Sequence, residues 1–367
     1  MNREKIRTWG APPAMLALGG VAGWLANRVG IPLAWMVGPL VVTAIATLSL
    51  KLPRLPVRAR YVGQVIVGSA VGLYLSPEAL DRILENAVPI VLGSLIITAA
   101  ACIIAIAQIR LAGANPATAV FSNVPGGPVD MAFLAGQYGG DPARTALAQT
   151  LRVTMVVLVL PPILIGFSDD VSARVYQYGT LADSAVLIAA GGVAGLLFRY
   201  LRLINPYFLG PMIVIGAATA LGVDLSHFHE GFVPAGQVLL GVSLGGMFQR
   251  SVFQNAGRFI VSLVMTSALL LLISAVTAEL IVALFSADLP TMVLANAPGG
   301  VPEMVITAQV LHLDVPLVAS FQFVRIIFSL SVAALLFRAV SSIRFLGGTG
   351  GRLARPADEC ESKEKDQ

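Results

Sequence analysis

The stretch Asn123-Val124-Pro125-Gly126-Gly127-Pro128-Val129-Asp130-Met131 returns 173 positions later as Asn296-Ala297-Pro298-Gly299-Gly300-Val301-Pro302-Glu303-Met304. Both copies join a Pro-Gly-Gly sequence, which interrupts a helix, to an acidic residue. Proline lacks a backbone donor and glycine tolerates left-handed geometry, so the chain is expected to unwind here. A polar break at membrane depth is costly unless it lines a protein cavity. The duplication therefore predicts two related half-sites.

The internal similarity extends well beyond this motif. Gly19–Gly23 returns unchanged as Gly191–Gly195, and Gly38-Pro39 returns as Gly210-Pro211, 172 positions later. The following matches lie 173 positions apart: Gly68 and Gly72 with Gly241 and Gly245, and Asp141, Gln149 and Arg152 with Asp314, Gln322 and Arg325. A period held over this length predicts two homologous halves. We place repeat 1 at 1–168, repeat 2 at 169–345 and a disordered cytoplasmic tail at 346–367.

The composition is that of an integral membrane protein. Of the 367 residues, 56% are hydrophobic and 12% are charged, and the mean hydropathy is +0.83. A soluble domain carries about 25% charged residues. The net charge of +4 lies mainly in short loops between apolar runs, where it orients a membrane protein. Direct binding of nucleic acid is therefore not expected.

The fold class predicted from the apolar runs is all-α, with about ten transmembrane helices of the length that spanning requires. Two Pro-Gly-Gly segments, 112–140 and 289–313, remain between them as re-entrant hairpins or broken spanning helices. The predicted spans in repeat 1 are 11–27, 32–50, 61–76, 88–109 and 142–166, and those in repeat 2 are 182–198, 204–222, 232–248, 258–286 and 315–337.

Loop charges favour the re-entrant alternative, because Lys and Arg gather in cytoplasmic loops. Five spans in each half make the repeats inverted about an axis in the membrane plane. Both termini are then cytoplasmic, in a bacterial cytoplasmic (inner) membrane, and the first apolar run is a retained helix. This topology places Lys51, Arg54, Arg58, Arg60, Arg110, Arg199, Arg202, Arg250, Arg258, Arg338 and Arg344 inside, places the acidic loops at 78–85, 169–170, 224–230 and 288 outside, and leaves Arg28, Arg82 and Arg174 as exceptions.

The candidate residues for binding a substrate or an ion surround the two breaks. Unwound carbonyls and amides can bind ions or a carboxylate, and the helix after each break points its positive end at the tip. The candidates are Asn123, Pro125, Gly126, Gly127, Asp130, Gln149 and Arg152 in repeat 1, and Asn296, Pro298, Gly299, Gly300, Glu303, Gln322 and Arg325 in repeat 2.

Each candidate type has a structural alternative. The two asparagines are either local turn formers or ligands. Asp130 and Glu303 are either acidic helix caps or ligands for a proton or cation. Arg152 and Arg325 either pair with these acids or clamp an anion, since guanidinium matches carboxylate in a bidentate manner. Asp141 and Asp314 fit helix N-caps better than site residues, and the glycine pairs fit close helix packing.

The sequence offers little for an enzyme. His227, His229 and Glu230 form the one cluster that resembles a metal site, but it falls in a predicted loop and has no counterpart in the other repeat. No catalytic residues, no metal site and no cofactor are therefore expected.

The paired Asn-x-Pro-Gly-Gly-x-x-acid-Met elements and the duplication resemble the membrane AbrB-duplication family over nearly the whole chain. Its members are labelled AbrB-family transcriptional regulators or ammonia monooxygenases. The family is distinct from the soluble AbrB transition-state regulators, which are small β-rich DNA-binding proteins. The resemblance implies a role in the regulation of gene expression but supplies no site residues.

The leading functional hypothesis is a secondary transporter of a small solute, such as an organic anion, coupled to H⁺ or Na⁺. The first alternative is a membrane-embedded regulator that changes gene expression through a partner. The second is a copper-dependent monooxygenase-like enzyme. The expected partners are a small-molecule or ion substrate and the lipid bilayer, and a homo-oligomer is compatible with these features.

Overall fold

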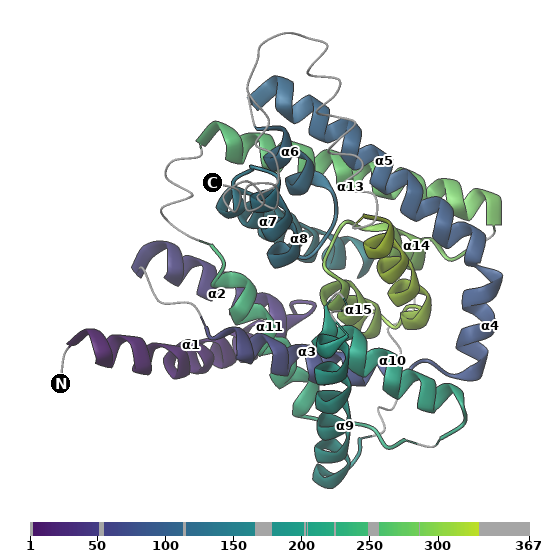
Figure 1. Ribbon diagram of the computed structural model, residues 1–367. Coiled ribbons are helices and arrows are strands. Elements are labelled where there is room, and N and C mark those ends of the chain that lie inside the picture. Colours follow the sequence, from purple (N-terminus) through teal and green to yellow (C-terminus); the bar gives the residue numbers. More distant parts are fainter. Residues whose placement is uncertain are drawn as a thin grey trace, which may run out of the picture.

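The computed structural model describes residues 3–50, 55–112, 115–165, 178–201, 203, 205–223, 225–248, 257–285 and 287–329, and the regular secondary structure in these ranges is helical (Figure 1). The predicted tail at 346–367 lies outside the described residues. The helices are α1 (Arg3–Arg28), α2 (Ala34–Leu50), α3 (Val57–Gly72), α4 (Pro77–Glu85), α5 (Ala87–Ala112), α6 (Pro116–Asn123), α7 (Pro128–Gln137), α8 (Pro142–Ile165), α9 (Leu181–Tyr200), α10 (Pro206–Ala220), α11 (Phe232–Gly245), α13 (Gly257–Phe285), α14 (Leu289–Asn296), α15 (Val301–Val310) and an apolar helix over Val315–Ser329, called here the final helix.

Each apolar run predicted as a span coincides with one of these helices, although α1 begins at Arg3 rather than near residue 11. Among the described residues, four helices are long and apolar enough to cross a membrane, and four apolar helices are shorter. The four long stretches are Ala87–Arg110, Pro142–Ile165, Leu181–Tyr200 and Gly257–Phe285. The chain is therefore a multi-pass membrane protein.

Helix α4 was not predicted, because its acidic residues led us to read this segment as a loop. Ser76 is its N-cap, and the Ser76 hydroxyl accepts a hydrogen bond from the Ala79 amide at 3.3 Å. A hydrogen bond with the Ser76 side chain also lowers the pKa of Glu78 below its ordinary value. One face of α4 carries Leu80 and Leu84, both exposed, so the helix is amphipathic.

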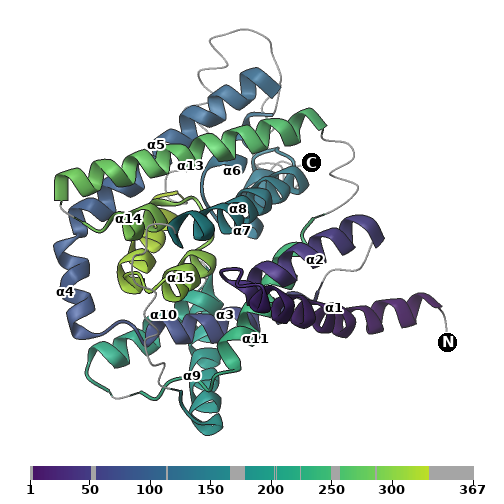
Figure 2. The ribbon, with the colours of Figure 1, turned by 180° about the vertical axis from the view of Figure 1, so that it is seen from behind.

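The helices form two groups, visible in Figures 1 and 2. The first group, in the lower half of Figure 1, contains α1, α2, α3, α9, α10 and α11. Within it α2 packs on α11, α10 packs on α3, and α3 packs on α11. Gly68 of α3 lies against the Phe208 carbonyl, and Gly241 of α11 lies against the Met36 carbonyl. The two contacts are equivalent, because Gly241 is the counterpart of Gly68 in the second repeat and Met36 is the counterpart of Phe208 in the first.

The second group contains α5 to α8, α13 to α15 and the final helix. The long helices α5 and α13 pack side by side along the upper edge in both views, and α6 and α7 pack on α8. One apolar core joins the groups, because Val67, Phe208 and Leu240 of the first group share it with Val301 and Met304 of α15. The Pro-Gly-Gly segments belong to the second group, and α15 borders the first.

Glycine positions at the helix contacts give a test of this packing. A Cβ added to Gly38 would lie 2.5 Å from the Ala22 carbonyl oxygen, and one added to Gly210 would lie 2.7 Å from the Ala194 oxygen. We expect Gly38→Ala and Gly210→Ala each to lower the free energy of unfolding by about 1–3 kcal/mol, because backbone must move apart. The measurement is thermal unfolding of the purified protein in detergent.

Gly20 and Gly192 are the matched controls, since they lie in the partner helices α1 and α9 with nothing within 4 Å of an added Cβ. Alanine at these positions should leave stability unchanged or raise it by roughly 0.5–1 kcal/mol through helix propensity. Equal melting temperatures for all four variants would contradict the described contacts.

Candidate functional site

Each Pro-Gly-Gly segment is a pair of short helices that turns back on itself. In the first, the Asn115 side-chain amide donates to the Gly139 carbonyl at 3.1 Å, and the Asp141 amide donates to Thr118 Oγ1 at 2.9 Å. In the second, the Asp314 amide donates to Thr291 Oγ1 at 3.5 Å. The beginning and end of each segment therefore lie together, with the break between α6 and α7 or between α14 and α15 at the tip.

The glycines of the motif make room for the two side chains that follow them. A Cβ on Gly126 or Gly299 would collide with the methionine five positions later, at 2.7 Å from Met304 Cε in the second copy. A Cβ on Gly127 or Gly300 would collide with the carboxylate of Asp130 or Glu303. The spacing Gly-Gly-x-x-acid-Met thus follows from an acid and a methionine that fold back over the start of a helix.

The carbonyls freed by each break are bound by a glutamine of the next helix. Gln149 and Gln322 are fully buried, at 0% exposure, in α8 and the final helix. Each Nε2 donates to three carbonyls at equivalent positions of its own break. The acceptors are Phe121, Ser122 and Val124 for Gln149, at 2.7, 3.4 and 2.9 Å, and Leu294, Ala295 and Ala297 for Gln322, at 3.2, 3.1 and 3.1 Å.

The two arginines join the breaks to each other. Arg325 donates through Nη1 to the Ala297 carbonyl and through Nη2 to the Gly299 carbonyl at 2.9 Å. Arg152, from the other half, donates through Nε to the carbonyl between them, Pro298, at 2.9 Å. Both arginines are 2% exposed. Three consecutive carbonyls therefore hold two guanidinium groups side by side.

Further acceptors fix the geometry of these arginines. Arg152 Nη1 also donates to the Ser122 and Asn123 carbonyls at 3.3 and 3.1 Å. Each arginine donates to the glutamine one turn earlier in its helix, Arg152 to Gln149 Oε1 and Arg325 to Gln322 Oε1, both at 2.5 Å. The structure thus brings together the predicted glutamines, arginines and breaks of both halves.

The buried positive charge has no carboxylate beside it. The ion pairs in the described part of the chain join Arg82 to Asp314 at 2.9 Å and Arg144 to Asp141 at 3.3 Å, and no carboxylate there comes within 4 Å of Arg152 or Arg325. The alternative in which these arginines pair with Asp130 or Glu303 is therefore not what this conformation contains. Helices α7 and α15 add positive N-termini, because their N-caps, Gly127 and Gly300, have no capping side chain.

The two acids of the motif share one cation that sequence reasoning missed. Arg60 of α3 attracts both Asp130 and Glu303 electrostatically, although it lies beyond 4 Å from either. Arg60 was interpreted as a cytoplasmic loop residue. Its equivalent in the other half is Val233, so the repeat gave no signal for it. Its Nη1 also donates to the Met247 sulfur at 3.6 Å.

The asparagines before the breaks behave differently in the two halves. Asn123 Nδ2 donates to Gln108 Oε1 at 2.6 Å and to the Ala119 carbonyl at 2.8 Å. Asn296 Nδ2 donates to the Met292 carbonyl at 3.0 Å, and its Oδ1 is buried against Gly93 without a hydrogen-bond partner among the described residues. Both therefore bind the preceding helical turn, as a local turn former does.

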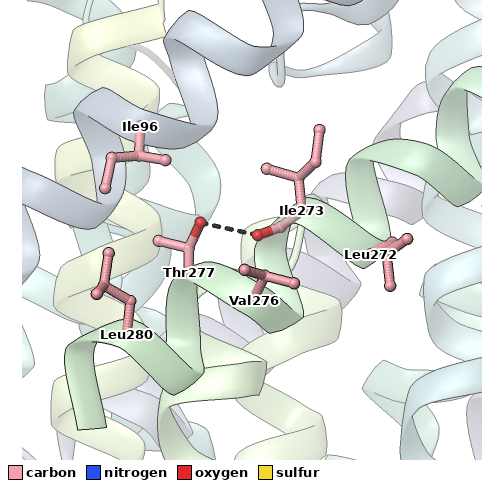
Figure 3. Close-up of a pocket in the computed structure, with 6 residues that line it drawn as sticks. All are labelled: Ile96, Leu272, Ile273, Val276, Thr277 and Leu280. Carbon is pink, nitrogen blue, oxygen red and sulfur yellow. Dashed lines mark hydrogen bonds between the residues drawn. The ribbon is translucent and has the colours of Figure 1, made fainter. Parts of the chain in front are cut away.

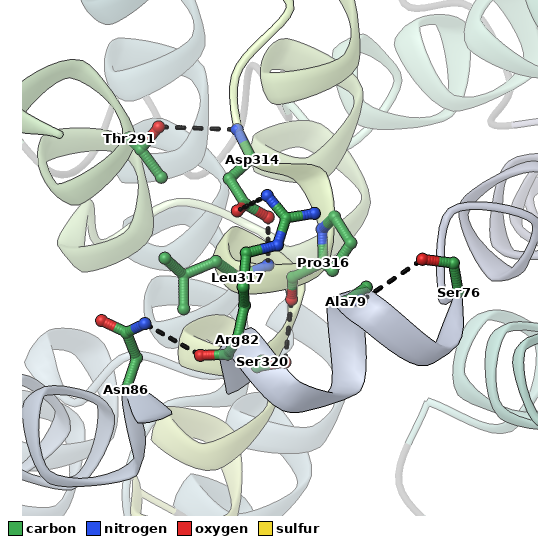
Figure 4. Close-up of polar contacts among 9 residues, drawn as sticks. All are labelled: Ser76, Ala79, Arg82, Asn86, Thr291, Asp314, Pro316, Leu317 and Ser320. Atoms are coloured by element: carbon green, nitrogen blue, oxygen red, sulfur yellow. Dashed lines mark hydrogen bonds and ion pairs between the residues drawn. The ribbon is translucent and has the colours of Figure 1, made fainter. Parts of the chain in front are cut away.

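The N-cap interpretation of Asp141 and Asp314 is confirmed. Asp141 Oδ1 accepts from the Ala143 amide at 2.9 Å, and Asp314 Oδ1 accepts from the Leu317 amide at 3.1 Å. Asp314 also forms an ion pair with Arg82 of α4, and this contact joins the first half of the chain to the end of the second hairpin (Figure 4).

Two other regions carry no polar site. His227 is exposed and His229 half-buried, and within the described ranges no group of three or more His, Cys, Asp or Glu side chains could hold a metal ion.

A cavity of about 320 Å³ between α5 and α13 is lined by Ile96 and by α13 residues that are apolar except Thr277. The Thr277 hydroxyl donates to the Ile273 carbonyl of its own helix, so the lining of this cavity is apolar (Figure 3).

Comparison with known proteins identifies the family. Residues 35–341 match the family model described as "Transition state regulatory protein AbrB". The chain belongs to the AbrB family. It is 26% identical over 327 residues to "Putative regulator AbrB" of Escherichia coli (strain K12), covering 87% of this chain and 93% of that protein. It is 25% identical over 350 residues to "Uncharacterized protein YhjN" of Bacillus subtilis (strain 168), covering 88% and 91%.

In this AbrB-family protein, Gly300 is expected to be indispensable because Glu303 occupies the space of a Cβ. Gly300→Ala should cost about 1–3 kcal/mol of stability through overpacking. Glu303→Ala removes the obstacle, so the double variant should lose less than the sum of the single losses, with a coupling of about 0.5–3 kcal/mol. Thermal unfolding of the four proteins measures the cycle. The control is Gly231→Ala, at an N-cap with open space around it; strict additivity would refute the contact.

Replacing Gln322 tests whether the glutamines hold the breaks. Gln322→Leu removes the side-chain donor from the Leu294 and Ala295 carbonyls, while the Ala297 carbonyl keeps Arg325, and this loss should lower the free energy of unfolding by about 1–3 kcal/mol. Gln309→Leu is the control, because Gln309 Oε1 is buried with no partner among the described residues and its loss should be nearly neutral. The measurement is again thermal unfolding, and equal stability of the two variants would mean that the carbonyls have other donors.

Proposed function

We propose that this AbrB-family protein is a secondary transporter of small anionic solutes, coupled to a cation. The observation that carries the proposal is the pair of buried guanidinium groups, Arg152 and Arg325, held at the meeting point of two broken hairpins without a neighbouring carboxylate. Ionised side chains at membrane depth are costly and mark substrate or ion pathways. An anion that enters between the breaks would supply the missing negative charge.

The site retains donors for such a ligand. Arg325 Nε is buried and has no hydrogen-bond partner among the described residues. A guanidinium group presents its donors in a planar fork that matches a carboxylate or phosphate. These features select a small anion rather than a cation or a neutral solute.

Several equivalences between the halves support an origin in two repeats. Left-handed backbone occurs at Leu33 and Asn205, 172 positions apart, and at Gly139 and His312, 173 positions apart. Gly68 of the first half contacts α10 of the second, and its counterpart Gly241 contacts α2 of the first. This reciprocal pattern is what a two-fold axis relating the halves would produce. Together with the loop charges, these features favour inverted repeats whose hairpins enter a cytoplasmic membrane from opposite sides.

The two groups of helices provide the parts that alternating access requires. The hairpins belong to the second group, and α15 contacts α3 of the first group through apolar side chains. Relative motion of the groups would open the breaks to one side and then to the other. In this proposal the partners are the transported anion, the coupling cation and the bilayer, nucleic acid is not bound directly, and assembly with a second copy is compatible.

The name of the Escherichia coli relative favours a second candidate, a regulatory role. The described residues lie in helices and short connections, with no strand among them. A regulatory signal would therefore have to pass to a partner protein. Transport and regulation are compatible if the transported anion is itself the signal.

Uptake by proteoliposomes tests the transport proposal. The probes are radiolabelled acetate, lactate, succinate and phosphate. We expect one or more to be taken up, and we expect Arg152→Gln and Arg325→Gln to reduce that uptake roughly 10- to 100-fold, the equivalent of one charged hydrogen bond of about 1.5–3 kcal/mol. Arg144→Gln is the control, because Arg144 pairs with Asp141 at the exposed start of α8.

Both site arginines also hold the breaks, so each variant is checked for its melting temperature and dispersity. Stabilisation of the unmodified protein by the same probes gives a second readout, since a ligand of the folded state raises the melting temperature. Neither uptake nor stabilisation with any probe, or unchanged uptake in both site variants, would reject transport of these anions and leave the regulatory candidate as the better one.

A further inference from the structure

Equivalent residues of the two hairpins differ sharply in exposure. On α7, Val129 is 61% exposed, Phe133 is 64% exposed, and Asp130 between them is also exposed. The equivalent residues of α15 are Pro302, Ile306 and Glu303, and all are buried, with Glu303 at 4%. The local motif is the same in both halves, so the difference comes from what covers each helix.

Helix α15 is covered by the first group of helices. Met304 and Val305 belong to the large core that includes Val67 of α3 and Phe208 of α10. On α7, Met131 and Ala135 pack instead with α5 and α6, within the second group. In this structure the second hairpin is therefore covered by the first group of helices, and the equivalent face of the first hairpin is uncovered.

The surroundings of Glu303 contain little that could neutralise a carboxylate. Helices α3, α8 and α14 contact α15; α3 and α8 carry the charged residues Arg58, Arg60, Arg144 and Arg152, α14 carries none, and the final helix contributes Arg325. Of these, Arg60 is the group that attracts Glu303, from beyond 4 Å. An ionised carboxylate that is buried without a close partner is far less stable than the neutral acid.

The surroundings of Glu303 are poorly suited to coordinate a sodium ion. Hard cations need a shell of oxygen ligands, such as the free carbonyls of an unwound segment. Here the carbonyls of Ala297, Pro298 and Gly299 already accept hydrogen bonds from guanidinium groups. These carbonyls are therefore not free to build such a shell, whereas a proton needs only one carboxylate oxygen.

We propose that the coupling ion is a proton, carried by the buried Glu303 in this conformation and by Asp130 in the conformation where the first hairpin is covered. The proposal rests on the transport function proposed above. The open carboxylate takes a proton from water and forms an O–H bond. The neutral acid is then buried as the hairpin closes, and it returns the proton to water when relative motion of the two groups of helices opens the site to the other side of the membrane. Arg60 favours this release, because it attracts the carboxylate that remains.

Infrared spectroscopy of the full-length protein in nanodiscs tests whether Glu303 is protonated, and it needs no substrate. The pH is varied between about 5 and 9, around and above the ordinary range of a carboxyl group. We expect the C=O band of a protonated carboxylic acid to persist at neutral pH in the unmodified protein and in Asp130→Asn. It should be absent in Glu303→Gln and retained, at a shifted frequency, in Glu303→Asp.

Glu279→Gln is the matched control, because Glu279 is an exposed acid of α13 outside the site and its replacement should leave the band unchanged. Replacing choline chloride by sodium chloride should change neither the spectrum nor the melting temperature. Absence of the band from the unmodified protein, its persistence in Glu303→Gln, or a specific effect of sodium would each overturn the proton assignment.

A transport assay distinguishes a failure of proton coupling from a failure of the proposed transport function. With the probe that is taken up, an inward proton gradient should sustain about tenfold accumulation per pH unit for one proton per monovalent anion. Glu303→Gln should abolish this accumulation while probe exchange across the membrane continues. Accumulation driven by sodium instead would reject the proton and keep the transporter. No flux of any probe would reject the transporter, and the infrared band would still decide whether Glu303 holds a proton.

Discussion

An unwound backbone inside a membrane must find hydrogen-bond donors within the protein, and this requirement organises the site. At each break one glutamine binds three carbonyls, and an arginine one turn further along the same helix binds further carbonyls of that break. A buried carbonyl without a hydrogen-bond donor would cost several kcal/mol where water is excluded. The Gln-x-x-Arg pair therefore makes a broken helix compatible with a bilayer, and it brings positive charge to the tip as a direct result.

Much of this could be read from the sequence, because the physical rules involved are local or periodic. Apolar runs located the long helices, and the offset of the repeated motif singled out Gln149, Arg152, Gln322 and Arg325 before their contacts were known. The Pro-Gly-Gly chemistry predicted the breaks. The capping roles of Asp141 and Asp314 followed from their positions at helix starts.

Long-range contacts were beyond such reasoning. Arg60 has no equivalent in the other half, and only the packing of α3 against α15 brings it to the acids. The link from Arg152 to Pro298 joins residues of different halves, and no spacing rule predicts it. The unequal burial of Asp130 and Glu303 follows from what packs against α7 and α15, which the shared local motif does not encode. Helix α4 was missed because its pattern is amphipathic and short, and its charges resemble those of a loop.

The exchange of helices between the halves has a consequence for biosynthesis. The surfaces that cover Gly68 and Gly72 come from α10, and α11 covers the Met36 and Leu40 carbonyls of α2, so both partners are synthesised after the first half has entered the membrane. Until then α2 and α3 present their small-residue faces to lipid, where a tight helix contact is not yet available. The first half of the chain therefore lacks the partners of α2 and α3 until the second half is made, and a chain that ended between the halves would leave these faces uncovered.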